Sequence, residues 1–205
     1  MMNIIISDRK QRTRLPDIMR TAVHLFVKKG IDGTTIKDIA KAAKVAEGAL
    51  YRHYKSKEDL AWELFSTHLS KFTADLMGKV YPEPTAEKRI HMFVEESFTA
   101  FEQDPELYSY LILQEHSELL KYSESYVHPG HVVTKIIEDG QKSGEIRSGD
   151  PFVLGSMFVG GVIRVCVVKM YGNITEDLKG FVDVVAQMSW TMLKKPSQTE
   201  SVGPS

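Results

Sequence analysis

Residues 34–60 read TTIKDIAKAAKVAEGALYRHYKSKEDL, and they predict two short helices joined by a tight turn and followed by a long helix. Thr35 is a favourable N-cap, and Asp38 three residues later completes a capping box, so the first helix is expected to begin there. The second short helix is expected over roughly 47–53. The pattern Ser56-Lys57-Glu58-Asp59 repeats the capping signal and starts the long helix. Two short helices at this spacing have the dimensions of a helix-turn-helix.

The second helix of a helix-turn-helix enters the DNA major groove with its N-terminal residues at the base edges. That end carries Glu47, Gly48 and Ala49, whose small members allow a close approach to DNA, and alanine suits contact with a thymine methyl group. Lys57 adds a cation to a helix N-terminus whose free amides favour phosphate. Three further side chains are suited to contacts with phosphate or bases: Tyr51, Arg52 and His53.

The charge of the chain is unevenly distributed, although the formal net charge is −1. Residues 1–60 hold 13 Lys and Arg against 7 Asp and Glu, whereas residues 61–205 hold 13 against 20. A basic front favours a polyanionic partner for that part, although a solvated basic face is the simpler alternative. The single cysteine, Cys166, excludes an internal disulfide framework and fits a reducing compartment. The N-terminal MMNIII is too short for a signal sequence, so a cytoplasmic protein is expected.

The remaining pattern predicts an all-α fold of about nine helices, because no segment alternates apolar and polar residues. Residues 1–13 are expected to form a flexible basic arm and residues 196–205 a disordered tail. Residues 151–171 approach the length of a membrane span, but Arg164 and Lys169 favour a core or interface helix. The expected helices cover about 15–30, 35–44, 47–53, 56–80, 85–103, 105–121, 129–144, 151–171 and 175–193.

An ordered set of residues in the N-terminal part resembles the DNA-binding domain of TetR-type transcriptional regulators. The match runs without a gap, and the ordered set is highly specific although each element alone is weak. Its members are Ala22, Leu25, Phe26, Gly30, Thr34, Thr35, Ile39, Ala40, Ala43, Val45, Gly48, Leu50, Tyr51, His53, Tyr54, Ser56, Lys57, Glu58 and Leu60.

The resemblance implies an all-helical homodimer with two domains per chain. A helix-turn-helix domain over 14–60, continuing into the fourth helix, would precede a ligand-binding and dimerisation domain over 61–195. The implied partners are double-stranded operator DNA and a small-molecule effector, which in most such proteins releases the operator. Carried over by position, the DNA contacts of the family fall on Thr35, Lys37, Glu47, Gly48, Ala49, Tyr51, Arg52, His53 and Lys57, and Tyr51 and Lys57 are the surest phosphate contacts.

The chain departs from the family at the start of the second short helix. The family often has serine where this chain has Ala46, and frequently a basic or polar residue where it has Glu47. Alanine is a poor N-cap, which costs about 1 kcal/mol. Glu47 suits the helix dipole and is able to accept from cytosine N4, although an acidic side chain there more often turns away from phosphate. Operator preference is therefore expected to differ from that of relatives at this point.

The last helix and the apolar helix before it carry the expected dimer interface. Its seam residues are spaced 3, 4, 3 and 4 apart, which suits helix packing in a bundle, and packing within one chain is the alternative. With residues 151–171, the seam resembles the two-helix contribution of the family to a four-helix dimer interface. The seam consists of Leu178, Phe181, Val185, Met188 and Met192.

The family does not carry an effector across by motif, so the effector pocket is predicted from residue properties alone. Ordinary core packing is the simpler interpretation of any single apolar member. Arg164, inside an apolar helix, is expected to meet a ligand anion or to pair with Glu96 or Glu115. The apolar candidates are Phe72, Phe93, Phe98, Tyr108, Ile112, Met157 and Val165, and the polar ones are Glu96, Ser97, Glu115, His116 and Arg164.

No motif in the sequence indicates catalysis, a cofactor or a metal. His128 and His131 lack a third ligand nearby in sequence, and Cys166 is expected to be a buried apolar side chain rather than a redox sensor. The favoured hypothesis is a repressor released from a palindromic operator by a small, apolar or amphipathic effector. The alternatives are a small-molecule-binding or catalytic helical protein with a vestigial helix-turn-helix, and a non-specific DNA-binding protein. The sequence leaves repressor and activator undecided.

Overall fold

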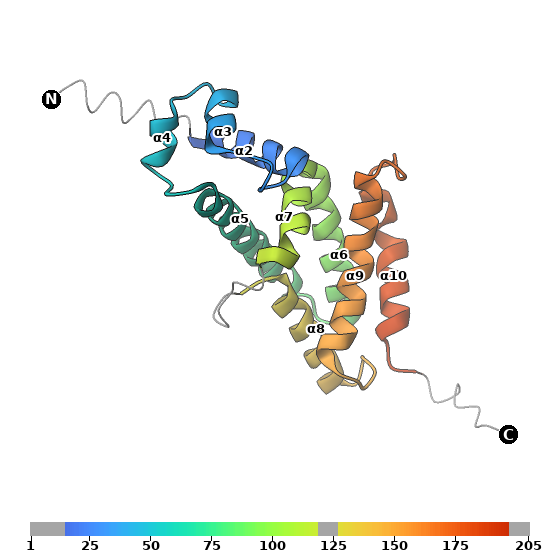
Figure 1. Ribbon diagram of the computed structural model, residues 1–205. Coiled ribbons are helices and arrows are strands. Elements are labelled where there is room, and N and C mark those ends of the chain that lie inside the picture. The colour runs from blue at the N-terminus through green and yellow to red at the C-terminus, as the bar shows by residue number, and fades with distance from the viewer. Residues whose placement is uncertain (1–14, 119–126, 197–205) are drawn as a thin grey trace. The chain divides into compact units, whose positions relative to one another are not determined.

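The computed structural model describes residues 15–118 and 127–196, without the side chains of 115–118. Over these residues the chain is all-α, as predicted, with nine α-helices, one short 3-10 helix and a single isolated β-bridge between Ile146 and Lys194. The predicted arm over 1–13 and residues 197–205 of the predicted tail lie outside the described residues. The helices are α2 (Leu15–Lys29), α3 (Ile36–Ala42), α4 (Glu47–Tyr51), α5 (Lys57–Val80), α6 (Ala86–Gln103), α7 (Pro105–Glu118), α8 (Pro129–Ser143), α9 (Pro151–Met170), η2 (Leu178–Phe181) and α10 (Val182–Leu193) (Figure 1).

The chain divides into two compact units. Within the described residues, unit 1 comprises 15–68 and 106–118, and unit 2 comprises 69–105 and 127–196. Unit 1 therefore holds the predicted helix-turn-helix segment together with the first part of α5 and nearly all of α7. The domain boundary expected after residue 60 stays a prediction.

The core of unit 1 joins α7 to helices that precede it by many residues. The rings of Phe26 in α2 and Tyr110 in α7 stack with their centroids 5.9 Å apart. The Tyr110 hydroxyl donates to the carbonyl oxygen of Ala61 in α5 over 2.8 Å, and its side chain is buried. Because a buried hydroxyl needs a hydrogen-bond partner, this contact helps to fix the position of α7 within the unit.

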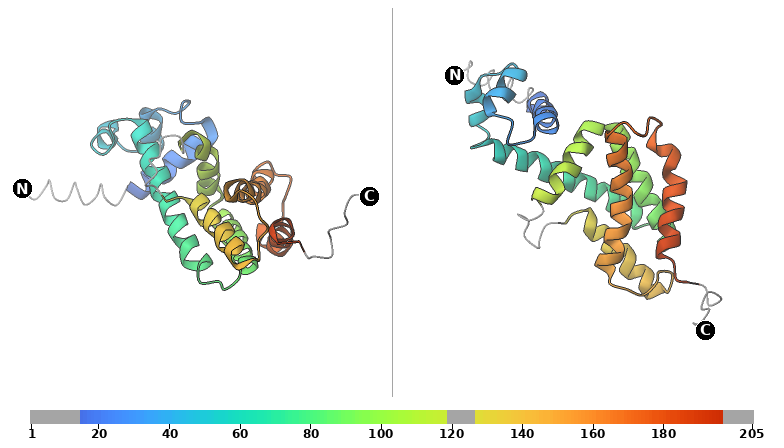
Figure 2. Two further views of the ribbon diagram at one scale, coloured as in Figure 1. Left: turned by 90° about the horizontal axis from the view of Figure 1, so that it is seen from below. Right: turned by 45° about the vertical axis from the view of Figure 1, so that its right-hand side comes forward.

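Unit 2 is a helical bundle in which α6 and α9 supply much of the core. Figure 2 shows α9 and α10 side by side, and α6 packs against both of them and against α8. The aromatic rings of Phe93 and Phe158 meet at 5.2 Å between centroids. The predicted apolar face of α6 is confirmed, because all six of its predicted members are buried: Ile90, Phe93, Val94, Ser97, Phe98 and Phe101.

Most of the predicted helix starts are confirmed by their caps. Thr35 and Asp38 form both halves of the capping box of α3. The Ser56 hydroxyl accepts from the Asp59 amide at the start of α5 over 3.0 Å. Asp150 accepts from the amides of Phe152 and Val153, ahead of Pro151 at the first position of α9.

The expected single helix over about 175–193 is wrong at its start. Residues 178–181 form the 3-10 helix η2, and α10 begins only at Val182. Asp177 holds this geometry because its carboxylate accepts from the Lys179 amide over 2.8 Å, and Gly180 in the same turn disfavours a continuous α-helix. The amide of Leu178 also donates to the Glu102 carboxylate of α6 over 2.9 Å, a contact that periodicity does not predict.

Candidate nucleic-acid interface and effector site

The two short helices of unit 1 are fixed by their apolar sides. Ile39 of α3 and Leu50 of α4 are almost fully buried, and Tyr54 is buried just after α4. The Tyr54 hydroxyl donates to the Glu63 carboxylate over 3.3 Å, and burial, together with this neighbouring charge, raises the pKa of Tyr54 to about 12. The hydroxyl therefore stays protonated and anchors the segment after α4 to α5.

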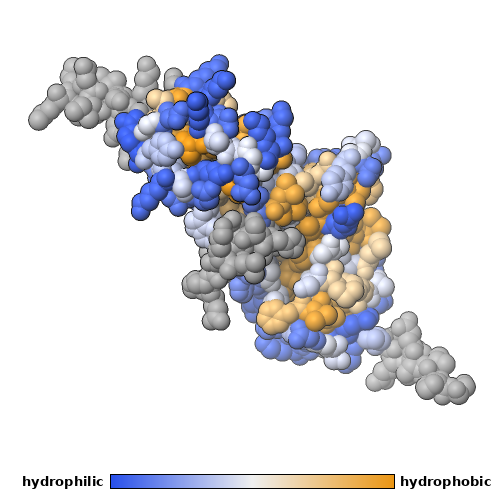
Figure 3. All heavy atoms as spheres, viewed as in Figure 1, coloured by the Kyte–Doolittle hydropathy of each residue, from blue (hydrophilic) through white to orange (hydrophobic). Residues whose placement is uncertain are grey.

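The opposite sides of α3 and α4 are open to solvent. With Leu50 buried, the predicted contacts at the start and end of α4 point away from the core. Figure 3 shows that the surface of this unit in view is mostly hydrophilic. Seven of the predicted DNA contacts are exposed: Thr35, Lys37, Glu47, Gly48, Tyr51, Arg52 and His53; Ala49 and Lys57 are half-buried.

Gly48 has no role in the packing of unit 1. A Cβ atom placed on this residue would meet no other atom within 4 Å, and the backbone is helical. Glycine in a helix is less favourable than alanine by up to about 1 kcal/mol. The fold of the single chain therefore does not explain why residue 48 is a glycine. Close approach of another molecule to the backbone of α4 would explain it.

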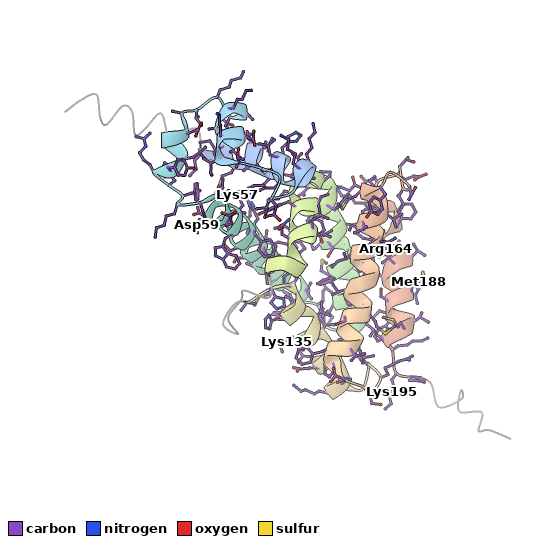
Figure 4. All side chains as sticks on the ribbon, in the orientation of Figure 1. Lys57, Asp59, Lys135, Arg164, Met188 and Lys195 are labelled. Carbon is purple, nitrogen blue, oxygen red and sulfur yellow. The ribbon has the colours of Figure 1, made fainter. Side chains whose placement is uncertain are left out.

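Lys57 lies at the start of α5, where Figure 4 labels it, and its ammonium group forms hydrogen bonds within unit 1. Nζ donates to the carbonyl oxygen of Ile31 over 2.9 Å and to that of Asp32 over 3.2 Å, both in the turn between α2 and α3. The Glu58 carboxylate lies 3.7 Å from the same Nζ, beyond hydrogen-bond distance. A lysine ammonium has three donors, so one N–H remains for an external acceptor. Sequence reasoning identified Lys57 but missed these two acceptors, because no local pattern relates residue 57 to the turn.

The turn between α3 and α4 contains an unusual backbone conformation. Lys44 has a φ of 55°, in the left-handed region that favours glycine. Ala46 is the N-cap of α4 and makes no side-chain hydrogen bond there, as its residue type predicts. Hydrogen bonds from Thr35 lower the pKa of the Asp38 carboxyl, so the carboxylate of this capping box stays ionised to a lower pH than a free aspartate.

The predicted effector residues fall in both units. Tyr108 and Ile112 belong to unit 1 and are half-buried, and the side chains of Glu115 and His116 lie outside the described residues. In unit 2 the core holds Phe93, Ser97 and Phe98, and Phe72, Glu96 and Val165 are half-buried, whereas Met157 is 60% exposed. A common pocket for these residues stays a prediction.

Arg164 lies on the exposed side of α9, where Figure 4 labels it. Among the described residues it forms no ion pair. Its suggested partner Glu96 instead binds Lys79, with Oε2 and Nζ 2.6 Å apart. A largely buried ion pair of this bundle is formed by Lys169 and Glu102, whose side chains are each 17% exposed.

An apolar surface follows α9 and α10. Figure 3 shows hydrophobic residues gathered over this part of unit 2. Of the predicted seam, Leu178 is buried within the unit, Met188 is 69% exposed, and Phe181, Val185 and Met192 are half-buried. Neighbouring exposed residues are Val153 and Met157 of α9 and Val184 of α10, and α9 also carries Gly160 and Gly161 on its open side.

By length and composition, α9 is the one helix in the described residues that could cross a membrane. Its apolar window is only 22% buried, but a single such helix is weak evidence. Arg164 on its open side argues against lipid, since a lone charge in a bilayer is costly. An interface helix accounts for the same composition.

The remaining reactive groups of the described residues are a cysteine and a pair of histidines. Cys166 is fully buried, and this burial raises the pKa of its thiol to about 12, which leaves it inert at neutral pH. No group of three potential metal ligands occurs among the described residues. His128 and His131 lie together at the start of α8, where the centroids of their rings are 4.2 Å apart.

Comparison with known proteins gives a consistent result. Residues 18–64 match the model of the family described as bacterial regulatory proteins, tetR family. The chain is 31% identical over 182 residues to the HTH-type transcriptional repressor KstR2 of Rhodococcus jostii, covering 82% of this chain and 84% of that protein. It is 24% identical over 159 residues to the fatty acid metabolism regulator protein of Bacillus subtilis, covering 76% of this chain and 82% of that protein.

Solved structures share the fold. The regulator FadR from Bacillus subtilis, solved in complex with stearoyl-CoA, superposes with a TM-score of 0.73 at 22% identity, over 85% of this chain and 97% of that one. The family indicated by the residues between Ala22 and Leu60 is thus confirmed by a relative that matches over most of both chains. The chain belongs to the TetR family of bacterial transcriptional regulators.

Proposed function

We propose that the protein is a homodimeric repressor that leaves a palindromic operator when a small, largely apolar effector binds. The observation that carries the DNA-binding part is the exposed side of α3 and α4, which gathers the positions expected to contact DNA opposite a buried Leu50. It acts in the cytoplasm, where operator DNA is accessible, and needs no catalytic group.

In this proposal α4 enters the major groove, and the glycine at position 48 allows its backbone to approach the bases. Tyr51 and the remaining N–H of Lys57 bind phosphate, which positions the helix without reading sequence. Lys37, at the start of α3, varies with operator sequence, as do residues 47–49 and 52–53 of α4 and its end, and Thr35 is a further contact. Two copies would place their reading helices about 34–36 Å apart, or further where the half-sites are more widely spaced.

The exposed apolar surface of α9 and α10 is the proposed contact with the second copy. Met157 and Met188 supply large apolar side chains, and the open glycines of α9 permit a close helix crossing. Exposed apolar surface of this kind marks interaction sites. The four helices from two copies would form a bundle.

The proposed effector carries a long apolar chain, and a long-chain acyl-CoA is the first candidate. Support comes from the likeness to FadR, which was solved with stearoyl-CoA, and from the apolar character of the predicted pocket residues. Binding would release DNA only if the effector favours a dimer geometry that does not fit the operator.

The substitution Gly48→Ala tests DNA binding apart from folding. We expect a stability gain of up to about 1 kcal/mol, because the helix improves and no atom obstructs the new methyl group. Binding to DNA from upstream of the protein's own gene, measured by fluorescence anisotropy, should weaken at least tenfold, about 1.4 kcal/mol.

Gly78→Ala in α5 is the matched control, since its Cβ would also meet nothing within 4 Å. It should raise stability and leave DNA binding unchanged. Unaltered operator affinity in the Gly48 variant would contradict the proposed reading helix. Addition of stearoyl-CoA to the wild-type complex tests the effector, and an unchanged anisotropy would remove acyl-CoA from consideration.

A further inference from the structure

The first turn of α8 is held by two histidine side chains. The Gly130 amide donates to Nδ1 of His128 over 3.1 Å, and the His128 amide donates to Nδ1 of His131 over 3.2 Å. The two rings meet edge to face. Together they form a capping box in which both side-chain acceptors are imidazole nitrogens.

The sequence His128-Pro129-Gly130-His131 is suited to this arrangement. Proline at the first helical position has no amide that needs an acceptor. A Cβ at residue 130 would lie 2.7 Å from Cε1 and 2.9 Å from Nδ1 of His128, so the ring is seated against the glycine. Capping boxes usually rely on Ser or Thr with Glu or Gln, which would not change charge near neutral pH as histidine does.

The two hydrogen bonds specify the protonation state of the cap. A nitrogen that accepts from an amide carries a lone pair, so the proton of each neutral ring resides on Nε2. Protonation of Nδ1 would place an N–H against an N–H and remove the bond. It would also place positive charge at the positive end of the α8 dipole.

Within residues 15–114 and 127–196, the charged groups of the neighbouring elements offer little to offset such a charge. The Asp139 carboxylate of α8 is already bound by two cations. Lys135 of the same helix donates to it over 2.9 Å, and Arg89 of α6 donates to it over 3.0 Å. The neighbouring helix α9 approaches this end of α8 at Gly155, which lies against Val133. The charged residues of α9 are the cations Arg164 and Lys169. Within the described part of the chain, no carboxylate forms an ion pair with His128 or His131.

We propose that the cap formed by residues 128–131 is a pH-sensitive device that holds the first turn of α8 while the His128 imidazole is neutral and releases it when that ring is protonated. This function is separate from the proposed DNA and effector binding. Because Val133 on the next turn packs behind Gly155, release of the cap would loosen the support of α9 from inside unit 2.

The direction of the pH effect follows from linkage. Burial, with a smaller effect of His131, lowers the pKa of His128 below its ordinary value. An unfolded histidine protonates near pH 6.5, so below that value His128 binds a proton in the unfolded chain more readily than in the folded one. The stabilisation is complete above about pH 6.5 and is lost as the pH falls toward the lowered pKa of the folded state.

Amide hydrogen exchange across residues 128–133, corrected for the intrinsic pH dependence of exchange, tests the proposal in the full-length protein. Between about pH 8 and about pH 5 the opening equilibrium of these amides should rise roughly fivefold to tenfold, the effect of one lost hydrogen bond. Long-range proton–nitrogen NMR correlations should show the Nε2–H tautomer for both rings at the higher pH. A Nδ1–H tautomer, or protection that is unchanged with pH, would overturn the proposal.

The double substitution His128→Asn/His131→Gln is the matched control, because both residues cap helices without titrating in this range. Its exchange should be slow and independent of pH, while His128→Ala should exchange fast at both pH values. If the double variant kept the acid response of the wild type, the response would originate elsewhere and the proposal would fail.

Discussion

The ammonium nitrogen of Lys57 lies 2.9 Å from the carbonyl oxygen of Ile31 and thereby ties the first turn of α5 to the turn that precedes α3. With 21% of its side chain exposed, Lys57 sits between the interior of unit 1 and solvent. It therefore has two separable roles, one in holding the helix-turn-helix and one, proposed above, in binding phosphate.

Lys57→Gln should separate these roles. We expect a loss of about 1–2 kcal/mol in the free energy of unfolding, because two hydrogen bonds from a charged donor disappear at a partly exposed site. The slope of log affinity for operator DNA against log salt should fall by about one, the effect of one phosphate contact. Lys79→Gln in unit 2 is the control and should leave the slope unchanged. An unaltered slope in the Lys57 variant would reduce this residue to a structural role.

Lys44→Gly should stabilise the protein by about 1 kcal/mol. The φ of 55° at this residue is unfavourable for any side chain with a Cβ and natural for glycine. Urea unfolding measures the difference, and Lys41→Gly within α3 should instead lose about 1 kcal/mol. A loss of stability in the Lys44 variant would mean that its side chain contributes more than its backbone costs.

Lys169→Met should destabilise unit 2 by about 2–3 kcal/mol, since it leaves the largely buried Glu102 carboxylate without its cation. The lysine also donates to the carbonyl oxygens of Thr175 and Glu176, over 3.3 and 2.6 Å, and so holds the loop before η2.

Lys135→Met breaks the more exposed pair with Asp139, 52% and 29% exposed, and should cost less than about 1 kcal/mol. The double variant Lys169→Met/Glu102→Gln should lose less free energy of unfolding than the two single variants lose in sum, because the two groups interact. Full additivity would show that the pair contributes no coupling.

Met188→Glu should convert the proposed dimer to a monomer, because it places a charge in the apolar surface of α9 and α10. Light scattering coupled to size exclusion should report a dissociation constant raised at least about a hundredfold, near 2.7 kcal/mol. Leu113→Glu in α7, at a residue that is 50% exposed in unit 1, should leave the mass unchanged. A variant at 188 that remains dimeric would place the interface elsewhere.

Local signals in the sequence predicted the starts of helices in both units well. Thr35 and Asp38 cap α3 through contacts three residues apart, and Asp150 with Pro151 starts α9, so each signal lies within one turn. Such features depend on few residues and little on tertiary structure.

Contacts between distant segments could not be predicted in this way. The Lys57 ammonium finds its acceptors 25 and 26 residues away, and Glu102 meets the Leu178 amide 76 residues later. Arg164 shows a further limit, since an apolar helix such as α9 does not reveal which side its own chain covers. The predicted effector pocket likewise depends on which side chains of α9 face the interior of their own chain.

The position of Tyr110 has a practical consequence for chimaeric regulators. A fragment cut at the end of the N-terminal segment would lose α7, leaving Phe26 without its stacked neighbour and the Ala61 carbonyl without the Tyr110 hydroxyl. The part of this protein proposed to read DNA therefore cannot be cut out as one contiguous segment of the gene without losing contacts of its core. To transfer the proposed operator specificity, one would graft the exposed residues of α3 and α4 onto a recipient protein rather than join the whole segment to it.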